Sequence, residues 1–372
     1  MIYLDYTANM PPEEAALERF CQVERQCLGN PNAHHAAGFA AQAQIADAGA
    51  QAAAALHVSP EELIFTSGAS ESNNTAIQGI AYASRHFGRH IISSPLEHAS
   101  VSGCLTALQE RGYQIDMLDI GPDGRVDLDS LRDLLRPDTV LVTLCAVDSE
   151  LGAVQPVAEA ARILSAYPHC RLHVDATQAV GRTAFDFSLA DTASLSGHKF
   201  GGLNGSGLLY KKSQVEVEPL IHGGVSTTLY RSGTPAAGLV ASLSLSQQMA
   251  LNAQPERFAH TARLNALLRQ ALAARGAQIH SPANAVPHIL NLGVPGIRGK
   301  DFRDALDRHG VCVSVKSACS VENTPSRAVY AVTHNRRQAL ESWRVSLCHH
   351  TTEDEINEFL HIFDAVCKEL KP

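Results

Sequence analysis

Short apolar runs alternate with amphipathic segments along most of the first two hundred residues. The apolar runs predict strands at residues 63–66, 90–94, 113–118, 140–146, 172–175 and 193–196. The segments between the later runs predict helices at residues 99–111, 128–135 and 157–167. Strands that alternate with helices are typical of a mostly parallel sheet covered by helices, so the pattern predicts an α/β fold.

A second, smaller α/β unit follows this region. One long helical stretch, residues 239–275, is expected to lead the chain out of the large sheet, after helices at residues 13–27 and 35–56. Beyond it we expect strands at residues 289–292, 311–315 and 343–347 and helices at residues 301–309 and 352–370. Because 372 residues are many for a single core, we predict a large domain over residues 13–250 and a small domain made of residues 1–12 and 251–372.

Composition narrows the classes of function. The formal net charge of −8 offers no basic surface for nucleic acid or an anionic membrane. No apolar run approaches a membrane span and the N-terminus lacks a signal-peptide pattern, so a cytoplasmic protein is expected. Nine cysteines without a Cys-x-x-Cys pair indicate reduced thiols rather than a disulfide framework or a zinc site. His34 and His35 would diverge on a helix, and we expect no metal site.

The first candidate chemistry is a lysine and an aspartate that follow consecutive strands. Asp175 ends the apolar run 172–175, and Lys199 follows the run 193–196 within Ser196-Gly197-His198-Lys199. Both side chains could enter the crevice beyond the strand ends, where open α/β sheets bind ligands. Pyridoxal phosphate needs such a pair: an amine for a Schiff base and a carboxylate for the pyridine nitrogen. Taken alone, the pair is more often a solvated lysine and an ordinary strand-end carboxylate.

Small residues and glycine stand between the strand 63–66 and the helix after it. The run from Ser67 to Asn74 would present free backbone N–H groups at the start of that helix, where phosphate binds well. The same residues also make ordinary helix caps. The glycines between Gly202 and Gly207 precede a strand-like segment instead of a helix, which argues against a dinucleotide loop.

Four motifs together make the sequence resemble a known family. They occur in the order Asp175-Ala176-Thr177-Gln178, Ser196-Gly197-His198-Lys199, Arg231-Ser232-Gly233-Thr234 and Ser317-Ala318-Cys319. In this combination the chain resembles the cysteine desulfurases, pyridoxal-phosphate enzymes of fold type I, essentially from end to end. The resemblance implies a large domain with a mostly parallel seven-stranded sheet and a smaller C-terminal α/β domain. The spacing from Cys319 to Arg344 leaves room for a long loop. In this respect the chain resembles the branch of the family that supplies sulfur to iron–sulfur scaffolds and tRNA-modifying partners.

The resemblance also implies roles for individual residues. Lys199 would form the Schiff base with the cofactor, Asp175 would pair with the ring nitrogen, and Gln178 would bind the phenolic oxygen. His98 would stack on the ring and shuttle protons, although a lone histidine at such a turn is more often a cap or a surface residue. The phosphate would be held by Ala69, Ser70, Ser196, His198 and, from the second subunit of a homodimer, Thr234.

The substrate implied is L-cysteine. Arg344 would bind its carboxylate, although an arginine that pairs with a nearby acidic side chain is about as common. Cys319 would attack the substrate sulfur, leaving L-alanine and an enzyme persulfide for a sulfur-acceptor protein, either an iron–sulfur scaffold or a sulfur carrier.

Two departures from the family pattern keep other functions open. Ser149 stands where the family has an asparagine that contacts cofactor and substrate, and Lys316 replaces a glycine near Cys319. Ser149 is shorter than the amide and would reach the ring only through water. The alternatives are another fold-type I enzyme, such as a selenocysteine or other β-lyase or a class V aminotransferase, and a catalytically weak paralogue that serves as a binding partner.

Overall fold

The large sheet of the protein is mainly parallel. The computed structural model describes residues 1–226, 228–316 and 324–370. Seven strands lie in the order β2-β8-β7-β6-β5-β3-β4, and only β8 runs antiparallel to its neighbours. Their bounds are β2 Leu63–Thr66, β3 His90–Ser93, β4 Gln114–Met117, β5 Thr139–Cys145, β6 Arg171–Asp175, β7 Thr192–Ser196 and β8 Gly207–Lys211. The α/β fold expected from the alternating pattern is confirmed.

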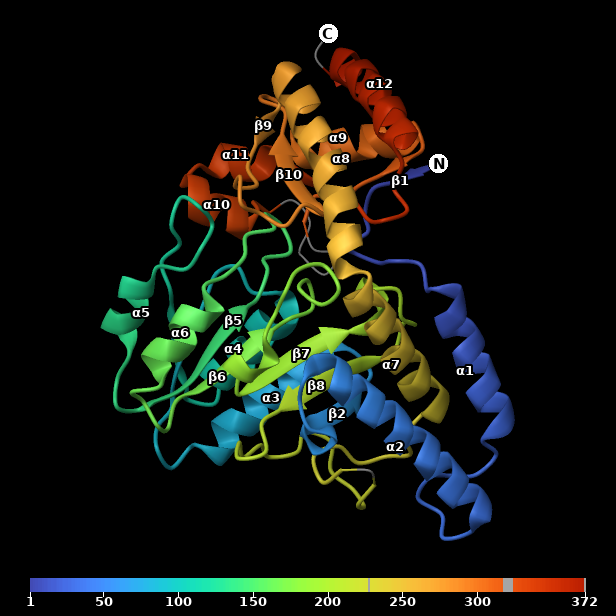
Figure 1. Ribbon diagram of the computed structural model, residues 1–372. Coiled ribbons are helices and arrows are strands. Elements are labelled where there is room, and N and C mark those ends of the chain that lie inside the picture. The colour runs from blue at the N-terminus through green and yellow to red at the C-terminus, as the bar shows by residue number, and fades with distance from the viewer. Residues whose placement is uncertain (227, 317–323, 371–372) are drawn as a thin grey trace.

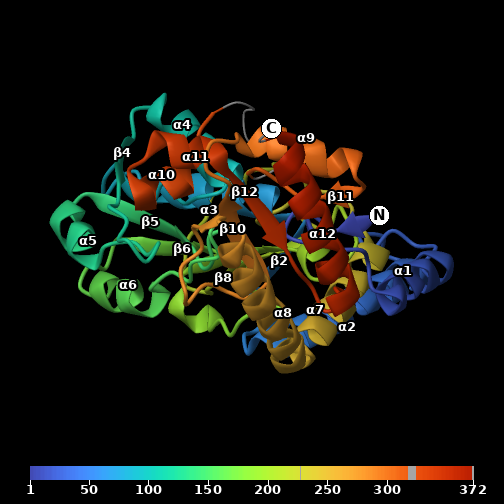
Figure 2. The same ribbon diagram turned by 90° about the horizontal axis from the view of Figure 1, so that it is seen from above.

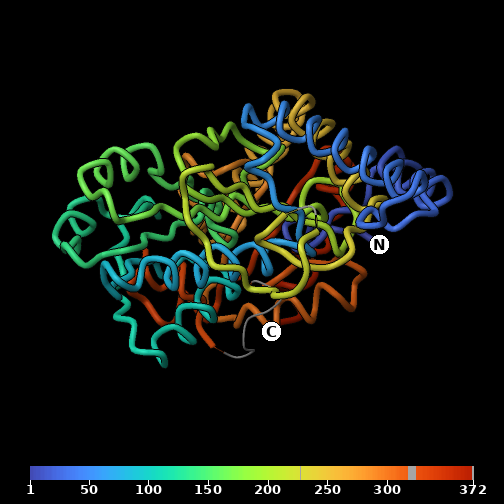
Figure 3. The backbone as a smooth tube through the Cα atoms, turned by 90° about the horizontal axis from the view of Figure 1, so that it is seen from below, coloured from blue at the N-terminus to red at the C-terminus, as the bar shows by residue number. Residues whose placement is uncertain are grey.

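Helices cover both faces of this sheet (Figure 1). Neighbouring strand residues point to opposite faces, so Ile91 packs with α3 and α4 while Ile92 packs with helices of the other layer. The helices are α2 Ala36–Leu56, α3 Ala69–Ala83, α4 Ala99–Gln109, α5 Leu128–Leu134, α6 Val157–Leu164 and α7 Ala237–Asn252. Helix α1 (Glu14–Gln26) and α2 both pack along α7, on the rim of the molecule (Figure 3).

A second core surrounds a small antiparallel sheet. Strand β10 (Ile289–Gly293) lies between β9 (Gln278–Ile279) and β12 (Ser342–Ser346). Around it lie α8 Gln254–Ala274, α9 Gly299–Arg308, α10 Arg327–Thr333, α11 Arg336–Glu341 and α12 Glu353–Leu370 (Figure 2). The N-terminal strand β1 (Ile2–Tyr3) joins this unit by pairing in parallel with β11 (Val311–Cys312). The N-terminal arm therefore crosses from this unit towards the large sheet.

Two expectations about the C-terminal third are wrong. The single helix expected over residues 239–275 is two helices, α7 and α8, which meet at Ala253. Pro255 stands in the first turn of α8, where its missing N–H costs no hydrogen bond and where it prevents one continuous helix. The strand expected at residues 311–315 ends at Cys312. Within the described part of the chain, no helix has both the length and the apolar character needed to cross a membrane.

Candidate active site

A cavity of about 380 Å³ brings together nearly all of the predicted site residues. It lies beyond the carboxyl ends of β6 and β7, and Arg344 enters it from β12 of the second unit. Asp175 ends β6 and Ser196 ends the neighbouring parallel strand β7, so the fold brings the two motifs to one edge. The predicted residues that line the cavity are Ala69, Ser70, His98, Ser149, Asp175, Gln178, Ser196, His198, Lys199 and Arg344.

The Asp175 carboxylate is fixed by two donors. Its Oδ2 accepts a hydrogen bond from Asn73 Nδ2 at 2.9 Å, and its Oδ1 accepts one from the backbone N–H of Thr177 at 3.0 Å. Only 6% of the residue is exposed. With both oxygens held, the carboxylate has one orientation, and its remaining acceptor capacity can serve a cationic N–H group in the cavity.

Lys199 follows β7 in a short 3₁₀ turn and reaches the N-terminal arm. Its ammonium donates to the carbonyl oxygens of Thr7 at 2.9 Å and Ala8 at 2.7 Å. Burial lowers the pKa of Lys199 to about 8, and the nearby guanidinium groups of Arg182 and Arg344 act in the same direction. In a sizeable fraction of the protein molecules, the Lys199 side chain is therefore a nucleophilic free amine near neutral pH.

Two histidines of the cavity are held in defined orientations. His98 caps α4, and its Nδ1 accepts the backbone N–H of Ser100 at 3.1 Å and lies 2.9 Å from Ser100 Oγ. His198 Nδ1 lies 3.0 Å from Ser196 Oγ. Burial lowers the pKa of both imidazoles, that of His198 to about 4. The capping position considered from the sequence is real, and it leaves Nε2 of His98 for the cavity.

Arg344 is a buried cation that already faces an acidic side chain. Its Nη2 donates to Asp5 Oδ1 at 2.9 Å, and its Nη1 donates to the carbonyl of Ser149 at 2.8 Å. Asp5 Oδ2 in turn accepts from Ser314 Oγ at 2.7 Å. Among the described residues Arg344 Nε has no partner. The ion pair weighed as an alternative therefore exists, and its arginine also lines the cavity.

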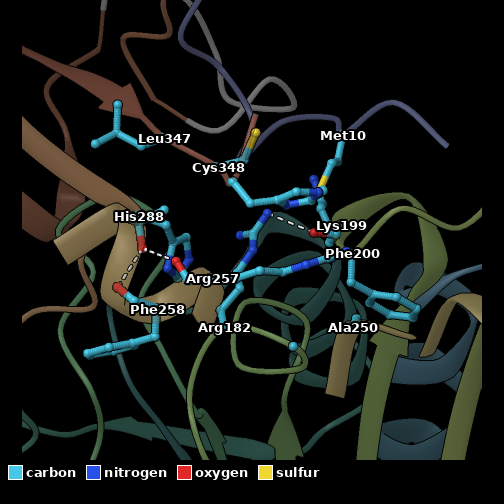
Figure 4. A pocket seen from close by; sticks show the side chains of 13 residues that line it. Met10, Arg182, Lys199, Phe200, Ala250, Arg257, Phe258, His288, Leu347 and Cys348 are labelled. Carbon is cyan, nitrogen blue, oxygen red and sulfur yellow. Dashed lines mark hydrogen bonds between the residues drawn. The ribbon is translucent and has the colours of Figure 1, made fainter. Parts of the chain in front are cut away.

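A second, smaller cavity lies behind Lys199 (Figure 4). Arg182 lines this smaller cavity and donates to the carbonyl oxygens of Lys199 at 2.8 Å and Tyr6 at 3.0 Å. Its other nitrogen donates to Gln178 Oε1, and Gln178 Nε2 donates to the carbonyl of Thr7 at 3.2 Å. Arg182 thus positions Gln178 and the Lys199 backbone from behind.

The start of α3 depends on a close glycine contact. Gly68, with φ of 150°, precedes Ala69 and Ser70, and a Cβ atom on Gly207 of β8 would lie 2.4 Å from its Cα. Only glycine at residue 207 lets the strand pass so near. Ala69 and Ser70, in the first turn of α3, line the cavity, where the small-residue run predicts phosphate-binding N–H groups.

One predicted residue that the structure describes, Thr234, does not line the cavity of its own chain. Thr234 lies near the surface, where its Oγ1 accepts from Asn30 Nδ2 at 3.4 Å, and it lines a different hollow. Cys319 lies outside the described residues. Lys316 donates to the carbonyl of Thr324 at 2.9 Å and to its Oγ1 at 2.7 Å, so the two residues on either side of the segment 317–323 are in contact.

Sequence reasoning missed several residues of the site. The sequence assigns no role to Asn73, Arg182 or Asp5. Asn73 nevertheless stands in the run of small residues that predicts a phosphate site. The described residues also contain one group of possible metal ligands, Glu13, His349 and His350, within 4.8 Å of one another. Arg257 lies 2.7 Å from the Glu13 carboxylate, which therefore already faces a cation.

Comparisons with known proteins show the family of the chain. Residues 2–359 match the family described as Aminotransferase class-V. A "NifS/IcsS protein homolog" from Lactobacillus delbrueckii subsp. bulgaricus is 35% identical over 98% of this chain and 97% of its own length. The "Cysteine desulfurase IscS" of Dictyoglomus turgidum is 30% identical over 100% of this chain and 95% of its own length.

Solved structures show the same likeness. A "NifS-like protein" superposes with a TM-score of 0.93 at 32% identity, covering 99% of this chain and 100% of that one. A structure named "SspA in complex with cysteine" has a TM-score of 0.82 at 28% identity, covering 95% of this chain and 100% of that one. The chain therefore belongs to the class-V aminotransferase family and, within it, to the NifS/IscS cysteine desulfurase family, whose members depend on pyridoxal phosphate.

Proposed function

We propose that this protein removes sulfur from L-cysteine, releases L-alanine and passes the sulfur on as a persulfide of Cys319. The protein is a pyridoxal-phosphate-dependent cysteine desulfurase. The observation that carries this conclusion is the single cavity in which an amine of lowered pKa, a fixed carboxylate and a buried arginine meet: Lys199, Asp175 and Arg344.

The residues present fit pyridoxal phosphate. Its aldehyde needs an amine, which Lys199 offers, and its protonated ring nitrogen needs an acceptor, which Asp175 offers with both oxygens already held. Its phosphate needs donors, which the start of α3, Ser196 and His198 offer. When bound, the cofactor accepts the electrons left at the substrate Cα after its proton is removed.

Lys199 and His98 are two groups of the cavity that can move protons. With a pKa of about 8, the Lys199 amine can take up and return a proton near neutral pH, which suits it to the proton at the substrate Cα. His98 Nδ1 is engaged by Ser100, so proton exchange by His98 goes through Nε2. We assign Lys199 as the base and His98 as the cofactor-stacking group that assists it.

Arg344 binds the carboxylate of the substrate. Its planar fork can donate two parallel hydrogen bonds, and the Ser149 carbonyl keeps Nη1 in place. Asp5 occupies Nη2 at 2.9 Å, so an incoming carboxylate competes with that side chain for the guanidinium. This competition favours a substrate that carries a full negative charge at this end.

Cys319 is the proposed acceptor of the sulfur. Its thiolate attacks the sulfur of the bound cysteine, so that an S–S bond forms while the Cβ–S bond breaks. The electron pair of the broken bond stays with the carbon, which takes up a proton and becomes the methyl group of alanine. The persulfide then passes to a sulfur-acceptor protein, for which we propose an iron–sulfur scaffold or a sulfur carrier.

We further propose that the active enzyme is a homodimer. Thr234 lies away from the cavity of its own chain, in a hollow with Ser67 and Gly205, which also line the cavity. A second copy docked over this hollow would bring its own Thr234 to the phosphate end of the site.

The test measures sulfur retained on the protein. The wild-type enzyme, Cys319→Ala and the control Cys21→Ala are each mixed with L-cysteine, and intact masses and alanine are measured. We expect the wild type and Cys21→Ala to gain one sulfur atom per chain and Cys319→Ala to gain none while still binding the cofactor. Normal sulfur transfer by Cys319→Ala would refute the role of Cys319, and a keto acid in place of alanine would indicate a transaminase.

A further inference from the structure

The amide of Asn73 hydrogen-bonds four polar side chains around the cavity wall. Its Nδ2 donates to Asp175 Oδ2 and to Ser100 Oγ, both at 2.9 Å. Its Oδ1 lies 2.9 Å from His173 Nε2 and also accepts from Ser194 Oγ. Asn73 is fully buried at 0% exposure and does not itself line the cavity. All four hydrogen-bonding positions of the amide are therefore used.

The orientation of this amide follows from its partners. An ionised carboxylate can only accept hydrogen bonds, so the nitrogen of the amide must face Asp175. The oxygen then faces His173 and Ser194, and both of these must donate to it. His173 is buried at 0% exposure and carries its proton on Nε2. No other orientation of the amide gives all four of its neighbours a hydrogen-bond partner.

The same orientation reaches His98 through Ser100. Because Ser100 Oγ accepts from Asn73, its hydroxyl proton points to its other neighbour, His98 Nδ1 at 2.9 Å. The backbone N–H of Ser100 donates to the same nitrogen at 3.1 Å. Two donors on Nδ1 exclude a proton there, so the neutral ring of His98 carries its proton on Nε2.

This proposal rests on the proposed function: we propose that Asn73 is the positioning residue that orients two groups of the site, Asp175 and His98. It holds the Asp175 carboxylate in the orientation that meets the ring nitrogen of the cofactor. Through Ser100 it also keeps His98 in the tautomer that presents an Nε2–H to the cavity. Proton abstraction from the substrate therefore falls to Lys199, and His98 enters the reaction as a donor.

The Asp175 branch is tested by cofactor affinity. Full-length wild type, Asn73→Leu, Asn73→Asp and the control Gln78→Leu are dialysed against pyridoxal phosphate, and the dissociation constant is measured. Asn73→Asp keeps the acceptor for His173 and loses the donor to Asp175. We expect both Asn73 variants to bind the cofactor at least about tenfold more weakly, and Gln78→Leu, on the same helix, to bind within about twofold of wild type. Normal affinity in Asn73→Asp would overturn the proposal.

The His98 branch is tested by Ser100→Ala and an NMR titration of the His98 imidazole. Losing the hydroxyl donor to Nδ1 destabilises the neutral ring, so the pKa of His98 should rise by about half a unit. Cofactor affinity stays within about twofold, because Asp175 keeps its donors. An unchanged pKa of His98 in Ser100→Ala would overturn this branch.

The two proposals fail in different ways. Dialysis measures only the binding of the cofactor and does not depend on turnover. A wild-type protein that binds the cofactor tightly but does not convert cysteine contradicts the proposed function, and the Asp175 branch can still be tested. An active wild-type enzyme whose Asn73 variants bind the cofactor normally contradicts only the role of Asn73. Thermal melting of each variant, including the isosteric Asn73→Asp, separates loss of affinity from loss of fold.

Discussion

The lowered pKa of Lys199 leads to a quantitative prediction about the cofactor-free protein. The pKa falls from 10.5 to about 8 because the amine is buried and lies near Arg182 and Arg344. A difference of about 2.5 units corresponds to roughly 3 kcal/mol of differential stabilisation between the charged and neutral forms. At pH 7.5 roughly a quarter of the side chains are then free amines, against about one in a thousand for an ordinary lysine.

The direction of the pH effect on stability follows from the protons that Lys199 binds in the folded and unfolded chains. Below pH 8 the folded and unfolded chains both hold this proton, and the folded chain bears the full cost of the buried ammonium. Between pH 8 and 10.5 only the unfolded chain still holds it, so folded stability rises with pH. Relative to Lys199→Met, the wild type should gain roughly 2 to 3 kcal/mol in the free energy of unfolding between pH 7 and pH 10.

The assay is urea unfolding of the cofactor-free wild type and of Lys199→Met at both pH values. Ionisation of thiols and tyrosines affects both proteins and cancels in the difference. The exposed Lys368 offers a control, because Lys368→Met should show the same difference from wild type at both pH values. If the difference between wild type and Lys199→Met also stays constant with pH, the amine is not destabilised by burial and the reasoning is wrong.

Three further predictions concern the substrate end, the phosphate end and the second core. Arg344→Lys should lower kcat/KM for L-cysteine about 10- to 100-fold with cofactor binding intact, because one charge-assisted hydrogen bond is lost; an unchanged alanine-formation rate would contradict carboxylate binding there. Gly207→Ala should weaken pyridoxal phosphate binding in dialysis, because its Cβ would meet Gly68 Cα at 2.4 Å, whereas Gly103→Ala has no atom within 4 Å and should not. Phe302→Ala, in the core at 0% exposure, should lower the free energy of unfolding by about 3 to 5 kcal/mol in urea titrations, and a loss below about 1 kcal/mol would show that the core closes around the gap.

Much of the site could be predicted because it depends on order along the chain. Asp175 and Ser196 follow adjacent parallel strands, and such strands end at one edge, so the pairing with Lys199 needs only the strand pattern. The proposed phosphate end was predicted in the same way, from the small residues between β2 and α3. Roles for Ala69, Gln178 and Thr234 came instead from resemblance to a family.

The remaining features depend on packing between distant segments. Asp5 and Arg344 are 339 residues apart, and only the docking of the N-terminal arm beside β12 brings them together. Asn73 reads as one of several polar residues at a helix start, and only the seating of α3 against β6 places its amide at Asp175. The break at Ala253 had a local signal in Pro255, which the long helical pattern obscured.

The most direct test of the central claim follows the visible spectrum of the purified protein before and after L-cysteine is added, with alanine and sulfide measured in the same sample. The account predicts a yellow protein whose spectrum changes on addition and which forms alanine and releasable sulfur in equal amounts. Lys199→Ala should lose both the spectral change and the products. A yellow wild-type protein that leaves cysteine unchanged would contradict the proposed desulfurase activity. A Lys199→Ala protein with full activity would contradict the role of Lys199 in the site.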